Sequence, residues 1–384
     1  MKRRSFTLFL VLAAISLQAQ ESPFLKKAYQ FLIKPEEVDT TRIYQPSKAC
    51  FSLGVFTTAQ KAGFNVDVDF TLDLFDGGTA PGLSQYSLSE DLCDKLGFEL
   101  AYGNASFSYS FELGSKSAWK KNSFGFNILG RTWGVRINYF KITNPFITTL
   151  TLGEEDDEDY FHDEVITPEG AYLRSFSIDG YYVFNNKRFA YPAAYKIGLV
   201  QCHTAGSWML TARYMQGSLF NSPDIYLSTY ATLDCYSTIQ ASVGGGYSAN
   251  IVLWHKDPKG PREQGLCNIT LNLTAMPVIT FVNYLKTISY IYEFDEETAE
   301  YCYANEDVSK IWCYPMPNYI GSAAASMTLG RIYFSAQFTY NWFYFRSNNA
   351  FKTSQIDIPN YVDDLKIKGS FHDWMLKGMV VYRF

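Results

Sequence analysis

Histidine, basic charge and long apolar runs are all scarce in this sequence. Its 384 residues include four histidines, and no Walker loop, paired CxxC or HExxH motif occurs. Scarce histidine leaves few options for metal binding or acid–base catalysis at neutral pH. The formal net charge of -5 argues against nucleic acid as the main partner, because that partner requires a basic face. After the first apolar segment no run of about 18 apolar residues recurs, which excludes a membrane-spanning helix there.

The N-terminus has the pattern of an export signal. Lys2, Arg3 and Arg4 precede an apolar run over 6–17, and small residues follow up to Ala19. The run is shorter than the roughly 20 residues that a membrane helix needs. We therefore predict a cleaved Sec-type signal peptide over residues 1–20. In a bacterium, such a signal peptide directs the protein to the periplasm, the outer membrane or the medium.

Alternation with a period of two fills most of the remaining chain. In FNVDVDFTLDLF (64–75) apolar residues alternate with polar ones, and RIYFSAQFTYNWFYFR (331–346) repeats the pattern with many aromatics. This period predicts β-strands. Soluble strands usually run about five or six residues, whereas a tilted transmembrane strand needs about 9–11. Several segments reach the longer length.

Three features favour a membrane barrel over a soluble sandwich. The strands are long, their apolar faces end in Trp and Tyr like an aromatic girdle, and the other face carries Ser, Thr, Asn and Asp. We predict an all-β protein, an antiparallel transmembrane β-barrel of about 12 strands (range about 10–14) over residues 48–384. A soluble exported β-sandwich that binds polysaccharide through exposed aromatics is the alternative fold.

The strand count contains an internal conflict. Candidate strands lie at 48–59, 63–75, 94–102, 105–114, 122–130, 132–142, 174–184, 206–218, 224–234, 239–255, 265–276, 318–328, 332–346 and 366–384. These fourteen segments place the long connections 76–93 and 143–173 on the periplasmic side, where short turns are expected. We therefore prefer a barrel with fewer strands than these fourteen segments. Residues 21–47 are polar to mixed and predict a partly helical periplasmic segment before the barrel.

The last residues, WMLKGMVVYRF, have the pattern of a strand rather than of a polar tail. Trp374, Leu376, Gly378, Val380, Tyr382 and Phe384 are predicted to face lipid. Met375, Lys377, Met379, Val381 and Arg383 are predicted to face inward. A terminal aromatic after alternating apolar residues resembles the insertion signal that barrels present to the barrel-assembly machinery, here Val380, Tyr382 and Phe384. An edge strand of a soluble sheet is the plainer interpretation.

Charged residues on the polar faces form the main candidate site. The predicted lumen charges are Asp67, Asp69, Asp73, Glu112, Arg136, Asp179 and Arg213. Buried charges must pair or meet water. A self-neutralising salt-bridge network is favoured over the selectivity lining of a pore, because the set contains both signs.

An acidic run, GEEDDEDYFHDE, offers weak ligands for a divalent cation. Asp156, Asp157, Asp159 and Asp163 supply oxygen atoms, but the run lacks the glycine and the spacing of an EF-hand. The run predicts a solvated loop, so we expect no cofactor. If the loop is external, it offers a divalent-cation contact to lipopolysaccharide.

His203 and Ser207 suggest a lipid hydrolase only weakly, because no third orienting group is identified. Seven cysteines leave at least one thiol free, and Cys302 and Cys313 are a candidate pair within one predicted outer loop.

One long stretch resembles an uncharacterised protein family. Its elements are GYY and FN within 180–185, RFAYPAAY at 188–195, AGS at 205–207 and DTTRI at 39–43. They resemble the Gram-negative family named domain of unknown function 4421, over nearly the whole mature chain. The resemblance implies an outer-membrane barrel and supplies no known activity, so no functional residue is carried over.

The sequence therefore predicts an outer-membrane barrel, either structural or a narrow channel with a charged lumen. An outer-membrane enzyme acting on lipid or lipopolysaccharide is the alternative role. The expected partners are outer-membrane lipid, lipopolysaccharide and the assembly machinery. The oligomeric state stays open.

Overall fold

A computed structural model of the chain describes residues 39–45, 51–73, 79–89, 93–112, 120–143, 146–152, 162–166, 172–220, 235–259, 263–295, 300–348 and 362–384. Within these ranges, no helix has the length and apolar character needed to cross a membrane. The predicted signal peptide and the predicted N-terminal helix lie outside the described residues.

The described chain is almost entirely β-strand. The strands are β1 (Ile43–Tyr44), β2 (Phe51–Asp73), β3 (Thr79–Ser89), β4 (Cys93–Tyr102), β5 (Ala105–Glu112), β6 (Lys120–Leu129), β7 (Trp133–Thr143), β8 (Phe146–Leu152), β9 (His162–Ile166), β10 (Tyr172–Val183), β11 (Val200–Gln201), β12 (Ala205–Phe220), β13 (Cys235–Lys256), β14 (Cys267–Asp295), β15 (Glu300–Trp312), β16 (Met316–Leu329), β17 (Ile332–Arg346) and β18 (Val362–Arg383). A 3-10 turn, η2, covers Tyr191–Ala194.

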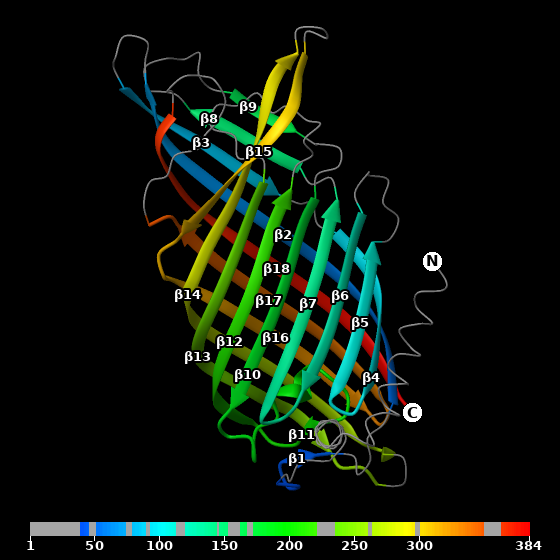
Figure 1. Cartoon of the computed structure of the whole chain (residues 1–384). Helices are drawn as coiled ribbons and strands as arrows, with labels where there is room; N and C mark the ends of the chain where they lie inside the picture. The colour runs from blue at the N-terminus through cyan, green and yellow to red at the C-terminus, as the bar shows by residue number, and fades with distance from the viewer. Residues whose placement is uncertain are drawn as a thin grey trace, which may run out of the picture.

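Twelve of these strands close into an antiparallel barrel (Figure 1). Their order is β2, β4, β5, β6, β7, β10, β12, β13, β14, β16, β17 and β18. The last strand pairs with the first over a long register, from Val362 opposite Leu72 to Arg383 opposite Ser52. Closure removes the open edges that hydrocarbon does not tolerate. The predicted all-β barrel of about twelve strands is confirmed.

The two ends of the barrel differ. At one end, called the turn end, two connections are tight: Gly103 and Gly330 adopt positive φ angles of 58° and 57° in the β4–β5 and β16–β17 turns. Glycine reaches this left-handed region at little cost. At the other end, called the loop end, β3, β8 and β9 extend the sheet from β2, and β15 extends it from β14 (Figure 1).

The structure corrects the fourteen-segment list. The segments 48–59 and 63–75 are one continuous strand, β2, of 23 residues. The segment 224–234 lies outside the described residues, and the ends that it joins, Phe220 and Cys235, are direct partners at the loop end. A single β2 removes the conflict of sidedness, because β3 and β8 then lie at the loop end with β15.

The polarity of β2 inverts along its length. Near the turn end, Leu53 and Val55 are exposed on the outside while Ser52 is buried inside. Farther along, Phe64 and Val66 are buried inside, although the residue parity of the two faces has not changed. In the sequence, the apolar residues of β2 therefore move from odd-numbered to even-numbered positions partway along the strand. This change gives one continuous strand the sequence pattern of two.

Large apolar side chains are exposed around the outside of the barrel. Aromatic members of this belt nearer the turn end include Trp133, Tyr182, Trp208, Trp254 and Tyr382, and those nearer the loop end include Tyr139, Trp312, Tyr314 and Tyr319. An apolar belt with aromatic margins is the outer surface of a transmembrane barrel.

The C-terminal strand contributes to this belt. Val380, Tyr382 and Phe384 are 48%, 42% and 58% exposed, whereas Met379 and Val381 are buried inside. The predicted division of the two faces of β18 holds for these residues. Phe384 also packs against Phe51 with ring centroids 5.9 Å apart, which joins the last residue to the first barrel strand.

A charge placed within the belt is expected to destabilise the barrel. Leu273, in the turn-end half of β14, is 56% exposed, and Leu273→Arg should lower the free energy of unfolding by about 2–4 kcal/mol, as for arginine near the midplane. Urea unfolding in lipid vesicles measures it. The matched control is Val308→Arg on β15, outside the barrel wall, which should change stability by less than about 0.5 kcal/mol. Equal losses in the two variants would contradict the position of the belt.

The structure does not form the candidate pair of Cys302 with Cys313. Cys313 is a free, buried thiol that follows β15, and Cys302 lies near the opposite end of that strand. At about 3.3 Å per residue the two are roughly 35 Å apart, whereas a disulfide requires Cα atoms within about 7 Å.

Candidate functional site: the chamber inside the barrel

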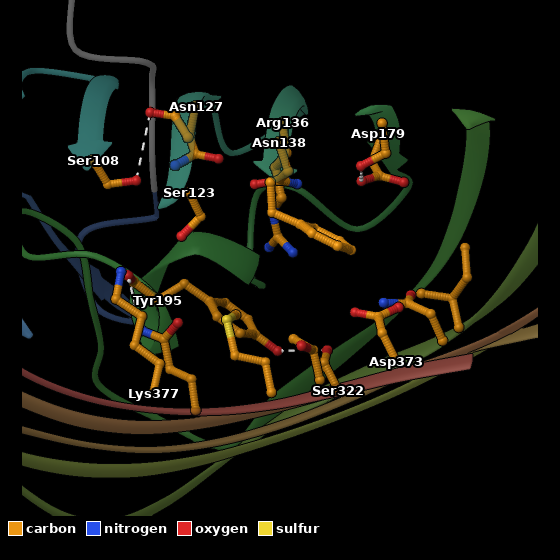
Figure 2. Close-up of a pocket in the computed structure, with 18 of the residues that line it drawn as sticks. Ser108, Ser123, Asn127, Arg136, Asn138, Asp179, Tyr195, Ser322, Asp373 and Lys377 are labelled. Carbon is orange, nitrogen blue, oxygen red and sulfur yellow. Dashed lines mark hydrogen bonds between the residues drawn. The ribbon is translucent and has the colours of Figure 1, made fainter. Parts of the chain in front are cut away.

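The interior of the barrel contains a cavity, called the chamber, which both polar and apolar side chains line. Its volume is about 240 Å³. Serine and asparagine side chains from β5, β6, β7 and β10 form one wall, and β16, β17 and β18 contribute to the facing wall (Figure 2). A liquid water occupies about 30 Å³, so the chamber has room for about eight waters or for one molecule the size of a monosaccharide.

The turn end of the chamber is closed by residues 188–202, called the plug. These residues belong to the connection between β10 and β12, and β11 within them pairs with β1. Most are buried, including Phe189, Tyr191, Ala194 and Tyr195. The plug packs against apolar side chains of the wall, among them Leu129 and Met209. Burial of this surface holds the plug inside the mouth of the barrel.

Hydrogen bonds tie the plug to several sides of the wall. The pairs are Tyr195 Oη with Asn272 Oδ1 (2.7 Å) and Ser322 Oγ (2.8 Å), Tyr333 Oη to Ala194 O (2.7 Å), Asn250 Nδ2 to Ala190 O (2.9 Å) and Asn268 Nδ2 to Gln201 O (2.9 Å). Lys196 Nζ donates to Leu129 O at 2.7 Å and to Asn104 Oδ1 at 2.8 Å. Because these partners lie on β13, β14, β16, β17, the end of β6 and the β4–β5 turn, the plug is held around much of the circumference.

A buried ion pair adds a second tie at the turn end. Arg383 of β18 contacts Glu263 of the β13–β14 turn, and their side chains are 5% and 12% exposed. Tyr44 Oη donates to the other oxygen of Glu263 at 3.3 Å. Glu263 holds a left-handed backbone with φ of 63°. Such a conformation persists in a non-glycine residue when its contacts fix it.

A cluster of apolar side chains lies across the lumen at the loop end of the chamber. Its buried members include Phe64, Met215, Tyr236, Phe345 and Phe371. Phe64 of β2 lies 5.8 Å from Phe345 and 6.1 Å from Tyr236, measured between ring centroids. Because β2 and β13 are not neighbours in the barrel, the contact between Phe64 and Tyr236 crosses the lumen.

Most charges of the chamber are paired directly. Arg213 Nε lies 2.9 Å from Asp179 Oδ1, and Arg213 Nη1 donates to Asn341 Oδ1 at 2.6 Å. Lys377 Nζ donates to Glu99 Oε2 at 2.9 Å. A charge inside a barrel is stable when such a partner compensates it.

Arg136 makes no direct ion pair within the described chain, although Asp179 lies opposite it on β10. Its Nη2 donates to Tyr191 Oη at 2.8 Å, and its Cζ lies 5.2 Å and 5.0 Å from the ring centroids of Tyr191 and Tyr195. The guanidinium therefore rests on the plug and points into the chamber (Figure 2).

The structure brings only part of the predicted lumen set together. Arg136, Asp179 and Arg213 all lie in the chamber wall. Glu112 is half-buried near the loop end of β5, with its Oε2 atom inaccessible to solvent. The side chain of Asp73 is outside the described part of the structure.

For Asp67 and Asp69 the lumen prediction is wrong. Both lie on the outer face, where Lys368 Nζ approaches them at 4.0 Å and 3.6 Å. The cause is the inversion of polarity along β2, which turns the apolar residues Phe64 and Val66 inward at this level.

Two other predicted sites gain nothing from the structure. Asp156, Asp157 and Asp159 lie outside the described residues, and Asp163 lies in β9 without a described side chain. The described residues contain no cluster of three metal-ligating side chains. Ser207 is buried and its Oγ accepts from Asn185 N at 2.9 Å, while His203 is exposed.

The plug was not anticipated from the sequence, although a signal was present. The run FAYPAAYKIGLV at 189–200 is apolar without a period of two, and it sits in a connection at the end where short turns are expected. An apolar segment that cannot be a strand and is long for a turn has to be buried in the barrel mouth. Glu99, Glu263 and Asp373 were also missed, and only cross-strand proximity identifies them.

Burial also sets the ionisation of two plug side chains. It raises the pKa of the Cys202 thiol to about 11, so the thiol is protonated at neutral pH. It raises the pKa of the Tyr195 phenol well above its usual range. At the start of the described chain, hydrogen bonds from Thr41 lower the pKa of Asp39.

The family described as "Domain of unknown function (DUF4421)" has a model that matches residues 38–257. The chain belongs to this family. The matched range begins beside the Asp39 turn, contains the plug and ends directly after β13. No curated protein matches the chain.

Among solved structures, the chain is similar to the outer membrane protease OmpT from Escherichia coli. The identity is 8%, the TM-score is 0.39, and the match covers 91% of this chain and 99% of that chain.

Proposed function

We propose that this family member is an outer-membrane barrel protein with a closed lumen, structural at rest rather than an open channel. The observation that carries the proposal is the plug, whose hydrogen bonds reach β13, β14, β16, β17, the end of β6 and the β4–β5 turn. An ion entering from the turn end meets the plug, and an ion entering from the loop end meets the apolar cluster. Hydrophobic constrictions exclude ions by dewetting.

The paired charges of the chamber support the same proposal. A selectivity filter presents charges of one sign to the passing ion. In the chamber, Asp179 is bound to Arg213 and Glu99 to Lys377, so these carboxylates and cations neutralise each other. The chamber is therefore better suited to stability or to binding than to conduction.

The proposed location is the outer membrane of a Gram-negative cell, with the turn end in the periplasm. The apolar belt, the tight turns with both described chain ends at that side, and the predicted export signal all support it. Val380, Tyr382 and Phe384 then serve as the insertion signal for the assembly machinery, and lipid and lipopolysaccharide surround the belt. No described observation favours a lipid hydrolase, because the Oγ atom of Ser207 binds the backbone.

The closed lumen is tested by electrical recording. The full mature protein, refolded and inserted in a planar bilayer, should leave the conductance at the level of the bare bilayer. Cell fractionation should place the protein with outer-membrane markers, and it should show heat-modifiable migration on a gel. Steady channel openings by the unmodified, heat-modifiable protein would contradict the closed state. Recovery in the periplasmic extract would contradict the location.

A further inference from the structure

We propose that the chamber binds a small monocarboxylate with hydrogen-bonding groups at its other end, and that Arg136 holds the carboxylate. The inference goes beyond the closed barrel and does not depend on whether the barrel conducts. It starts from the hydrogen-bonding groups of Arg136, the chamber cation that makes no direct ion pair within the described chain.

Arg136 is the chamber cation that makes no direct ion pair in the described structure, because Asp179, which lies opposite it on β10, binds Arg213 instead. The other two cations of the wall, Arg213 and Lys377, bind Asp179 and Glu99 at 2.9 Å each. Of the five guanidinium N–H donors of Arg136, one is directed to Tyr191 Oη. The planar guanidinium matches a carboxylate through two parallel hydrogen bonds. An ionised group away from bulk water needs such a counter-charge or other hydrogen-bond partners.

The wall next to Arg136 offers further polar groups. Asn138 lies two residues along β7 and lines the chamber, and its side chain makes no hydrogen bond with another described residue. Ser108, Ser123 and Asn127 lie on the same wall (Figure 2). Amide and hydroxyl groups in this arrangement donate and accept, so they suit hydroxyl or amino substituents of a ligand.

The facing wall contributes a carboxyl group. Asp373 lines the chamber on β18, beside its strand partner Asn341 (Figure 2). A hydroxyl or an ammonium group on the ligand would donate a hydrogen bond to this carboxyl. Because Arg136 is the one chamber cation without a direct ion pair in the described structure, the site favours a monoanionic carboxylate or a zwitterion over a dianion such as phosphate. The volume of about 240 Å³ limits it to one sugar unit or one amino acid.

The test is equilibrium dialysis with the full mature protein, refolded in detergent in the presence of each probe because both mouths are closed. The probes are D-glucuronate for a hydroxylated carboxylate and L-glutamine for a zwitterion. D-glucose and inorganic phosphate are the comparisons. We expect saturable binding of glucuronate or glutamine, at least about tenfold tighter than that of either comparison. One charge-assisted contact corresponds to about that factor.

Variants assign the binding to the chamber. Arg136→Gln should weaken binding at least about tenfold, and Asn138→Ala should weaken it several-fold, because each removes a chamber group. The matched control is Lys368→Gln on the outer face, which removes the same charge and should leave binding unchanged. Asn138→Ala removes no hydrogen bond between described residues, so this variant is expected to fold. It therefore still tests the proposal if Arg136→Gln does not fold.

The proposal is overturned if neither carboxylate probe binds, or if glucose or phosphate binds as tightly. It is also overturned if Lys368→Gln and the chamber variants behave alike. Channel openings in the bilayer experiment would reject the closed state but would leave this binding result intact, so the two failures are distinguishable.

Discussion

A barrel that lacks both the plug and the aromatic contact above the chamber is expected to conduct ions, whereas a barrel that lacks only one of them is not. The two closures lie in series along the lumen, so either one alone blocks the path. The plug occupies the turn end, and the contacts of Phe64 with Phe345 and Tyr236 occupy the loop end.

The plug is removed by joining Asn185 to Gly206 through a two-residue Asn-Gly turn in place of residues 186–205. Asn185 Nδ2 already donates to Gly206 O at 3.1 Å, so the two residues are close enough for a short hairpin connection. The aromatic contact is removed by Phe64→Ser with Phe345→Ser. Planar-bilayer recording should show discrete openings only when both changes are combined.

The control for the aromatic change is Phe338→Ser on the lipid-facing side, where the ring is 40% exposed. Combined with the plug deletion, it should leave the barrel closed. If the deletion does not fold, Lys196→Met loosens the plug without shortening the chain, and exposed Lys187→Met is its matched control. Labelling of Cys202 by a maleimide at pH 7 then reports the release, because burial raises the pKa of this thiol to about 11 in the closed state. Conduction by the plug deletion alone would show that the apolar cluster is not a barrier.

The second large effect is expected at the turn-end ion pair. Glu263→Gln removes the carboxylate that contacts buried Arg383 and should lower the free energy of unfolding by about 3–5 kcal/mol, the usual cost of removing one member of a buried ion pair. The loss should be smaller when Arg383→Gln is added, because the cation that this carboxylate compensates is then removed as well. Urea unfolding in vesicles gives each value.

The same turn provides a matched control. Asp257 lies 3.0 Å from His255 Nε2, but its side chain is 85% exposed. Asp257→Asn should therefore change stability by less than about 1 kcal/mol, as is typical of exposed pairs. Similar losses for Glu263→Gln and Asp257→Asn would mean that the Arg383 pair is solvated and contributes little.

The sequence by itself determined the barrel. Long alternating strands with aromatic ends are compatible with few other folds, since hydrocarbon requires every backbone N–H and C=O group to be paired within the sheet. It also determined the two faces of β18, because a period of two places Val380, Tyr382 and Phe384 together whatever the partner strand. Arg136, Asp179 and Arg213 were found for the same reason, within a stretch where the outside is lipid and the inside is polar.

Only the tertiary structure decided what fills the lumen. Alternation shows that the two faces of a strand differ, but it does not show which face points into the barrel. The inward face changes from polar to apolar where the surroundings of the barrel change from hydrocarbon to water. Along β2 this change brings Phe64 and Val66 inward and sends Asp67 and Asp69 outward, against the prediction. The plug, the pairing of Lys377 with Glu99 and the contact of Arg136 with the plug depend on segments remote in sequence, which a local pattern does not encode.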